Sequence, residues 1–517
     1  MEQPLKKYSN PIRRGFYPDP SIIRVGEDYY MVNSTFQYFP AIPISHSRDL
    51  IHWETIGHAV TDPSWLDLSE LEDSRGIWAP DISYYNGTFY IFATLRLNDW
   101  EKPARKQMMV KSDRPEGPYS KPVYLEADAI DPSHFVDDDG THYMITAKAA
   151  TGYRLNDDCT KVVEGPRVIW GGTGERCAEG PHILKRGGWY YAIVAEGGTG
   201  YGHGINIARS RELFGEYEPC PYNPVMRQTD PDALLQRCGH GKLVETQNGD
   251  WWCVYLCSRR NGGNYTTLGR ETALDPVTWT EDGWFLINGG NGPSLEQTAP
   301  ALEEFSAPET DTSNILKGLG EEIGLDWQFV RNPDYSRISL SERPGWLRIY
   351  PAKGELYKIE AKNILTHREP ELKYSASVKM EFEPAGENCH AGLTCYYSTA
   401  TYIRFSVCVE NGEKCLKVVA NRGSGEENAG EPVRIPKGEI YLRVDVDGQT
   451  RRFSYGFGGD EWKTAAILED CRFLSDEGVP NDRKRHTGTM TGVYAVCNSE
   501  ECEGMYADFT TTRQHRG

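Results

Sequence analysis

Four acidic residues and one histidine occupy similar places in five segments of this chain. Each stands upstream of a glycine that is followed three positions later by a large aromatic residue. The five residues are Asp19, Asp81, Asp131, Glu179 and His240. Carboxyl groups that share one pocket suit acid–base chemistry, because like charges raise the pKa of one group while another stays ionised. Cleavage of a glycosidic bond is the leading reaction that needs such a pair.

A structural explanation competes with this one for every acid taken alone. Aspartate is frequent beside proline and glycine, where its side chain caps turns. Recurrence at matching positions of a repeat favours convergence of the side chains on one place. Whether these side chains converge on one place depends on the secondary-structure elements that carry the repeat.

Residues 15 to about 290 contain the five segments, and each one predicts the same local structure. A short strand, a turn with glycine and an aromatic-rich strand form a β-hairpin pattern. Further strand-like runs resemble third strands, as at residues 42–47, 108–112 and 205–210. Repeats of 40 to 60 residues with four antiparallel strands are typical of propeller blades. We therefore expect a five-bladed β-propeller over residues 1–300, with first strands that line a central channel.

The rest of the chain shows no such repeat. Residues 301–319 have the Pro, Glu, Ser and Thr composition of a linker. Residues 320–517 contain short alternating strands separated by turn signals, which predicts a β-sandwich of jelly-roll or concanavalin-like type. The fold class is all-β.

Charge and hydropathy exclude two kinds of partner. The formal net charge is −19 over 517 residues, whereas phosphate backbones bind basic surfaces, so we expect no nucleic-acid partner. No stretch approaches the roughly 18 apolar residues of a membrane span, so we expect no membrane partner.

The N-terminal residues and the cysteines indicate where in the cell the protein is expected. Residues 1–15 lack the apolar core of a secretory signal. The 13 cysteines are scattered, which favours reduced structural thiols and a cytoplasmic protein. A signal sequence removed beforehand is the alternative.

Three further residues are candidates for binding a sugar. Phe36 and Trp78 lie near predicted blade entrances, and an aromatic ring packs well on the apolar face of a sugar. Arg270 could hydrogen-bond a hydroxyl group or change the pKa of a carboxyl group. Core packing for the rings and a surface position for the arginine are the alternatives.

Six motifs, in this order along the chain, resemble glycoside hydrolase family 43. They are Tyr-Pro-Asp-Pro-Ser at 17–21, Gly-Ile-Trp-Ala-Pro-Asp at 76–81, Ile-Asp-Pro-Ser-His-Phe at 130–135, Glu-Gly-Pro-His at 179–182, Gly-His-Gly at 239–241 and Leu-Gly-Arg-Glu-Thr at 268–272. Two later motifs, at 326–333 and 341–345, resemble the C-terminal sandwich of β-xylosidase and α-L-arabinofuranosidase members.

This resemblance implies an inverting mechanism and assigns roles. Asp19 would be the general base, Glu179 the general acid, and Asp131 the residue that raises the pKa of Glu179 and orients it. Phe36, Trp78 and Arg270 match subsite residues of similar xylosidases. His240 matches a histidine that approaches a bound calcium ion through water in many members, so Ca²⁺ in a structural or electrostatic role is implied, with sodium or water alone as alternatives. No organic cofactor is implied.

One departure from the family pattern affects specificity. Several similar xylosidases have histidine after Trp-Ala-Pro, where this chain has Asp81. A fourth acid is therefore expected near the channel. This departure weakens the transfer of xylosidase specificity from the family to this chain.

These observations predict an exo-acting hydrolase that removes terminal α-L-arabinofuranosyl groups from arabinoxylan or xylan oligosaccharides, with β-D-xylosidase activity as a second capability. A protein that is primarily a β-1,4-xylosidase, an endo-arabinanase and a non-catalytic carbohydrate-binding propeller are the alternatives. A homo-oligomer is left open.

Overall fold

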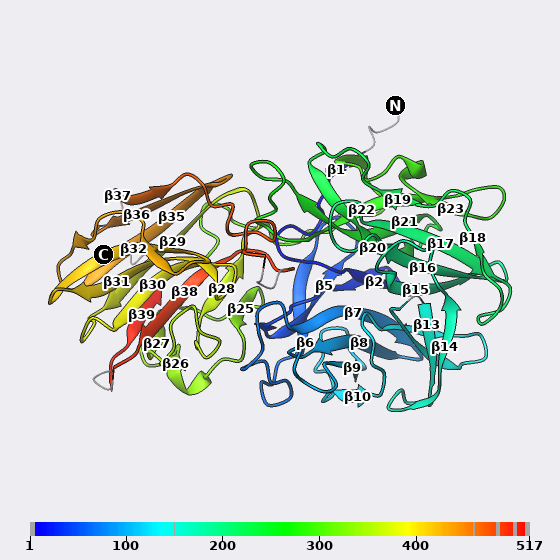
Figure 1. Ribbon diagram of the computed structural model, residues 1–517, viewed down its shortest axis with the longest axis horizontal. Coiled ribbons are helices and arrows are strands. Elements are labelled where there is room, and N and C mark those ends of the chain that lie inside the picture. Colours follow the sequence, from blue (N-terminus) through cyan, green and yellow to red (C-terminus); the bar gives the residue numbers. More distant parts are fainter. Residues whose placement is uncertain (1–5, 149, 459–460, 482–485, 500–503, 512–517) are drawn as a thin grey trace.

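The computed structural model describes residues 6–148, 150–458, 461–481, 486–499 and 504–511. Five small antiparallel sheets surround a common axis in the blue-to-green half of Figure 1, and two larger sheets form the yellow-to-red half. The expected all-β fold, a five-bladed propeller followed by a sandwich, is confirmed. The ends of the predicted domains, residues 1 and 517, lie outside the described residues.

Each blade is a meander of four main strands, and the blades are numbered I to V in chain order. In chain order the blades contain β2 (Ser21–Val25), β3 (Asp28–Val32), β5 (Ala41–Ser47) and β6 (Glu54–Val60); β7 (Gly76–Tyr85), β8 (Thr88–Arg96), β9 (Arg105–Ser112) and β10 (Val123–Leu125); β11 (Ser133–Val136), β12 (His142–Thr146), β13 (Ala150–Leu155) and β14 (Val162–Trp170); β15 (Glu179–Arg186), β16 (Trp189–Glu196), β17 (Gly204–Ser210) and β18 (Glu218–Pro219), with β19 (Met226–Arg227) also on β17; and β20 (Leu235–Glu245), β21 (Trp251–Arg259), β22 (Glu271–Trp279) and β23 (Phe285–Ile287).

The glycine of each repeat makes the first hairpin of its blade. In blade II a two-residue loop joins β7 to β8, and its residues Asn86 and Gly87 have φ of 47° and 83°. Two successive positive φ values give the turn whose twist matches that of paired strands. The aromatic-rich strand therefore folds back directly on the first strand, as the sequence predicts.

Apolar side chains between neighbouring blades hold the ring together. Ile44 of blade I packs in one buried cluster with Ile82 and Ile91 of blade II. The ring closes where Tyr29 of blade I meets Trp252 of blade V. The N-terminal strand β1 (Lys7–Ser9) pairs with β24 (Glu296–Thr298), which ties the two ends of the propeller segment together.

Two facing sheets form the sandwich. One contains β33 (Glu426–Asn428), β32 (Glu413–Arg422), β31 (Thr401–Glu410), β30 (Cys389–Tyr396), β38 (Met490–Cys497), β28 (Leu365–Arg368), β25 (Trp327–Val330) and β4 (Tyr38–Phe39), with β34 (Val433–Arg434) on β32; the other contains β26 (Ile338–Ser339), β27 (Leu347–Ile349), β39 (Ala507–Thr510), β29 (Lys373–Phe382), β35 (Glu439–Asp447), β36 (Thr450–Gly456) and β37 (Lys463–Leu468). Two 3₁₀ turns, η1 (Asn288–Gly290) and η2 (Tyr335–Arg337), complete the assignment for the described residues.

Alternation of apolar and polar residues explains these strands. In β35 the residues Ile440, Leu442, Val444 and Val446 are buried, and their neighbours face outward. The sequence did not predict the edge strand β4, which belongs to blade I by position but pairs with β25 of the sandwich. This pairing joins the two domains close to Phe36.

Two further expectations concern thiols and membranes. Eleven described cysteines are free thiols, but Cys497 is disulfide-bonded, so the expectation of reduced thiols is wrong for that residue.

Among the helical residues that the structure describes, none form a segment long and apolar enough to cross a bilayer.

Candidate active site

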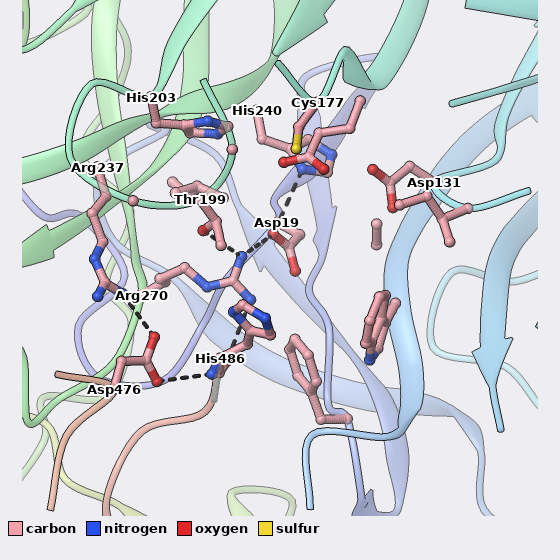
Figure 2. A pocket seen from close by; sticks show the side chains of 18 of the residues that line it. Asp19, Asp131, Cys177, Thr199, His203, Arg237, His240, Arg270, Asp476 and His486 are labelled. Atoms are coloured by element: carbon pink, nitrogen blue, oxygen red, sulfur yellow. Dashed lines mark hydrogen bonds and ion pairs between the residues drawn. The ribbon is translucent and has the colours of Figure 1, made fainter. Parts of the chain in front are cut away.

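A cavity of about 400 Å³ brings together seven of the eight residues selected from the sequence. Its lining includes Asp19, Phe36, Trp78, Asp131, Glu179, His240 and Arg270. They come from every blade. Figure 2 shows the labelled Asp19, Asp131, His240 and Arg270 around this cavity. The expected convergence is therefore present for three of the four acids and the histidine.

An unusual backbone conformation occurs at several residues that line the cavity. Asp19, Asp131 and His240 have φ of 52°, 55° and 48°, and Ala79 has φ of 40°. Residues other than glycine rarely adopt positive φ, and such strain clusters at functional sites. The pairing of the first strand with the second also shifts register at Glu179 and near His240. The strands thus bulge where they carry the site residues.

Asp19 is held as a carboxylate. Arg270 Nη1 donates to its Oδ1 at 2.7 Å, and the Ser34 hydroxyl donates to its Oδ2 at 2.6 Å. His240 Nδ1 lies 3.6 Å from Oδ1. Burial alone would raise the pKa of Asp19, but Arg270, His240 and Ser34 outweigh it and lower this pKa below its usual value.

Glu179 has the opposite electrostatic environment. Burial, followed by repulsion from Asp131 and Asp19, raises the pKa of Glu179 to about 8. A carboxyl group with this pKa is mostly protonated at neutral pH and can donate a proton. One cavity therefore holds a carboxylate and a carboxylic acid.

Asp131 connects to Glu179 through the backbone. Its Oδ2 accepts the N–H of Gly180 at 2.9 Å, at the residue that follows Glu179. Burial raises the pKa of Asp131 as well, with His240 opposing and Asp19 adding to the shift. Asp131 is thus placed both to orient the Glu179 segment and to repel its negative charge.

His240 packs directly on that segment. A Cβ at Gly180 would come within 2.6 Å of the His240 ring, so glycine is required there. Calcium prefers six to eight oxygen ligands. In the described part of the chain, no group of three or more potential ligands includes His240. These residues do not fit direct coordination of calcium, and no chemical step is assigned to an ion.

The aromatic candidates form one wall. The Phe36 and Trp78 rings lie 5.9 Å apart at 48°, and the Arg270 guanidinium lies 5.5 Å from the Phe36 ring. The Trp78 indole N–H donates to the Ser74 carbonyl group at 2.9 Å, which fixes the ring. Arg270 therefore joins the apolar wall to the Asp19 carboxylate.

Asp81 lies outside the cavity lining, which corrects the expectation that all four acids converge on one place. The expected fourth acid near the channel is present, because Asp81 contacts Ser21 of β2, the His134 N–H of β11 and Lys242 of β20. Lys242 Nζ pairs with its Oδ1 at 2.6 Å, and the Ser21 hydroxyl donates at 2.7 Å. Burial would raise the pKa of Asp81, but Lys242, His182 and the His134 N–H lower it. The register shift between Trp78 and Asp81 separates the residue that lines the cavity from the one that does not.

Sequence reasoning missed several residues of the cavity. They are Ala79, Ile130, Arg176, Cys177, Gly198, Thr199, Gly200, His203, Arg237, Leu256, Asp476 and His486. Several lie in the repeat segment beside the selected motifs, where proximity to a motif was the available signal. Asp476 and His486 belong to the sandwich segment, where no repeat marks them.

The sandwich residues close one side of the cavity. Arg237 Nη1 donates to Asp476 Oδ2 at 2.8 Å, and the His486 N–H donates to Asp476 Oδ1 at 2.8 Å (Figure 2). Arg270 Nη2 also donates to the His486 carbonyl group at 3.3 Å. One hydrogen-bonded network therefore runs from the second domain to Asp19.

Two family models match this chain. Residues 8–285 match "Glycosyl hydrolases family 43", and residues 320–513 match "Beta xylosidase C-terminal Concanavalin A-like domain". A crystal structure of a GH43 protein from Bacillus licheniformis has 55% identity and a TM-score of 0.92, with 98% of each chain covered.

Relatives with different names are similar over nearly the whole chain. A non-reducing end alpha-L-arabinofuranosidase of Bacteroides ovatus is 37% identical and covers 96% of this chain and 92% of its own. A xylan 1,3-beta-xylosidase of a Vibrio species is 35% identical and covers 94% and 95%.

Proposed function

The chain belongs to glycoside hydrolase family 43, and from this premise we propose that it removes single terminal pentoses from arabinoxylan- or xylan-derived oligosaccharides with inversion at the anomeric carbon. Terminal α-L-arabinofuranosyl and β-D-xylopyranosyl groups are both substrates. The observation that carries this proposal is the opposite direction of the pKa shifts of Asp19 and Glu179 in one cavity.

Each acid has one role in the proposed step. The Asp19 carboxylate takes a proton from water, and the resulting hydroxide attacks the anomeric carbon. The bond to the leaving oxygen breaks, and Glu179 gives its proton to that oxygen. Inverting hydrolases place a water molecule between base and sugar in this way. Asp131 acts through Glu179 and is a positioning residue.

Removal of one terminal sugar is supported by the enclosure of the cavity. Asp476 and His486 close a side that would have to stay open for a chain to pass through. An endo-arabinanase needs an open groove, so this alternative is disfavoured. Release of oligomers rather than single pentoses would revive it.

Dual specificity is supported by the two kinds of relative. The two sugars present similar hydroxyl groups around the reacting carbon, so one cavity can accept both. Related chains named for each activity align over more than nine-tenths of this chain. The Phe36 and Trp78 wall offers an apolar surface that suits either sugar ring.

The experiment compares hydrolysis of aryl α-L-arabinofuranoside and aryl β-D-xylopyranoside by one preparation, with Asp19→Ala as control. Cleavage of both that depends on Asp19 supports the proposal. Asp19-dependent cleavage of the xyloside alone would make the protein a β-xylosidase with the same groups. Binding of xylo-oligosaccharides without cleavage would favour a non-catalytic propeller.

Three finer statements are proposals with their own tests. Calcium held through water beside His240 predicts loss of activity with EDTA and recovery with Ca²⁺; unchanged activity would contradict it.

A cytoplasmic location predicts activity in the cytosolic fraction of the source cells and an imported oligosaccharide as substrate. A homo-oligomer predicts a multiple of the 58.4 kDa chain mass by light scattering.

A further inference from the structure

A buried group of three nitrogen and sulfur side chains lies on blade III, outside the catalytic cavity. It contains His134 on β11, His142 on β12 and Cys159 in the turn after β13. Cys159 Sγ lies 3.3 Å from His142 Nδ1 and 3.7 Å from His134 Nε2, and the two nitrogens are 2.9 Å apart. The three side chains are at most 9% exposed. The catalytic mechanism uses none of them.

The hairpin and the turn bring these atoms together. In the β11–β12 register, His134 faces Met144 and Val136 faces His142, so the histidines are diagonal neighbours on one face. Cys159 has φ of 59°, and its N–H donates to the Asn156 carbonyl group at 2.9 Å. A left-handed cysteine is uncommon, and this conformation sets its sulfur beside both imidazoles.

The distances are close to those of a tetrahedral metal site. With Zn–N of about 2.0–2.1 Å and Zn–S of about 2.3 Å, two nitrogen ligands lie roughly 3.3 Å apart and nitrogen and sulfur roughly 3.6 Å apart. The observed S···N distances of 3.3 and 3.7 Å bracket that value. The N···N distance of 2.9 Å is that of a hydrogen bond, and it must lengthen by about 0.4 Å to admit an ion.

The surroundings indicate which nitrogen of His134 can bind a metal ion, and they place negative charge beside the cluster. The Ser83 hydroxyl lies 2.6 Å from His134 Nδ1, which leaves Nε2 as the atom that faces the cluster. Metal-binding histidines usually have such a partner on the other nitrogen. Asp157 and Asp158 are exposed on the same turn as Cys159, and their charges favour approach of a cation.

We propose that His134, His142 and Cys159 bind a divalent metal ion of the zinc type, with a water molecule as the fourth ligand. The thiol proton goes to solvent, and the thiolate becomes the sulfur ligand. Nitrogen and sulfur ligands select zinc-like ions over calcium. The ion ties the turn at 156–161 to the β11–β12 hairpin, in a structural role separate from the hydrolytic step.

The test is a cobalt titration of chelator-treated full-length protein that carries Cys177→Ser. Among the described free cysteines, Cys177 is the exposed one, so its removal excludes cobalt binding by this exposed thiolate. The proposal predicts one Co²⁺ per chain, with a thiolate-to-cobalt band in the near ultraviolet and visible bands of a tetrahedral ion. Added Zn²⁺ removes these bands, and added Ca²⁺ does not.

Two variants locate the ion. Cys159→Ser is expected to abolish the thiolate band, and His142→Gln is expected to weaken cobalt binding at least tenfold. Zn²⁺ is expected to raise the melting temperature of the Cys177→Ser protein but not that of the His142→Gln derivative. Three results would each overturn the proposal. The first is absence of a thiolate band in folded Cys177→Ser protein, and the second is persistence of the band in Cys159→Ser. The third is an equal rise in melting temperature in His142→Gln.

Discussion

Asp131 of blade III accepts a hydrogen bond of 2.9 Å from the backbone N–H of Gly180 in blade IV, directly after Glu179. The same carboxyl group is the strongest charged contributor to the raised pKa of Glu179. One side chain therefore sets both the position and the protonation of its neighbour. The predictions below separate these effects from those at Asp19.

Asp131→Asn is expected to move the basic limb of the pH profile of kcat/KM to lower pH. Loss of the Asp131 charge lowers the pKa of Glu179 from about 8, and Glu179 must be protonated to act. Activity is then lost at a lower pH as the pH rises. Asp138→Asn, at an exposed position of the same blade, is the control. An unchanged basic limb in Asp131→Asn would show that repulsion from Asp131 does not set this pKa.

Glu179→Ala is expected to slow substrates with poor leaving groups by about 10²–10⁴, the usual contribution of a general acid. Aryl glycosides with good leaving groups need less protonation and should lose far less. Glu175→Ala, on the same connection and paired with Arg227 at the surface, is the matched control. Equal losses for both substrate types would remove Glu179 from the role of general acid.

Arg270→Met is expected to move the acidic limb of the pH profile to higher pH. Arg270 lowers the pKa of Asp19, so its removal raises this pKa, and the carboxylate needed as base is lost earlier as the pH falls. Steady-state rates between pH 4 and 9 measure this shift, with Arg260→Met as control because Arg260 lies outside the cavity lining and pairs with the exposed Asp232. A lower rate without a shift of the acidic limb would mean that Arg270 binds the sugar but does not set the pKa of Asp19.

Asp476→Ala is expected to destabilise the protein by about 1–3 kcal/mol, because it removes one of the two carboxylate partners of the buried Arg237, the other being Glu477, and takes away the acceptor of the His486 N–H. Both side chains are nearly inaccessible in this 2.8 Å pair. Asp470→Ala, which breaks the exposed pair with Arg472, should cost at most about 1 kcal/mol. Denaturant melts of the two variants make the comparison, and similar losses would contradict a structural role for the Arg237–Asp476 pair.

The repeat explains why so much of the site was predictable from the sequence. Asp19 and Asp131 precede the first strands of their blades and Glu179 begins one, so the propeller's symmetry brings them together once the hairpins are recognised. Asp81 shows the limit of that reasoning. It follows the same pattern, yet the register shift at Trp78 places it with Lys242 instead of in the cavity.

The remaining features depend on contacts between distant segments. Asp476 and His486 reach the cavity from the sandwich, more than 200 residues from the nearest repeat motif, and local periodicity has no information about such contacts. The pairing of Tyr38–Phe39 with β25 is equally non-local. The left-handed backbone at Asp19 and Asp131 is a conformation that aspartate adopts more often than most residues, but residue type alone does not say which aspartates adopt it.

The central claim is hydrolysis by an Asp19 base and a Glu179 acid with inversion. The most direct measurement is proton NMR of the first-formed sugar during hydrolysis of an aryl β-D-xylopyranoside, recorded before mutarotation. The account predicts α-D-xylose as the initial product, with none formed by Asp19→Ala. Initial release of β-D-xylose would mean retention through a covalent intermediate and would contradict it.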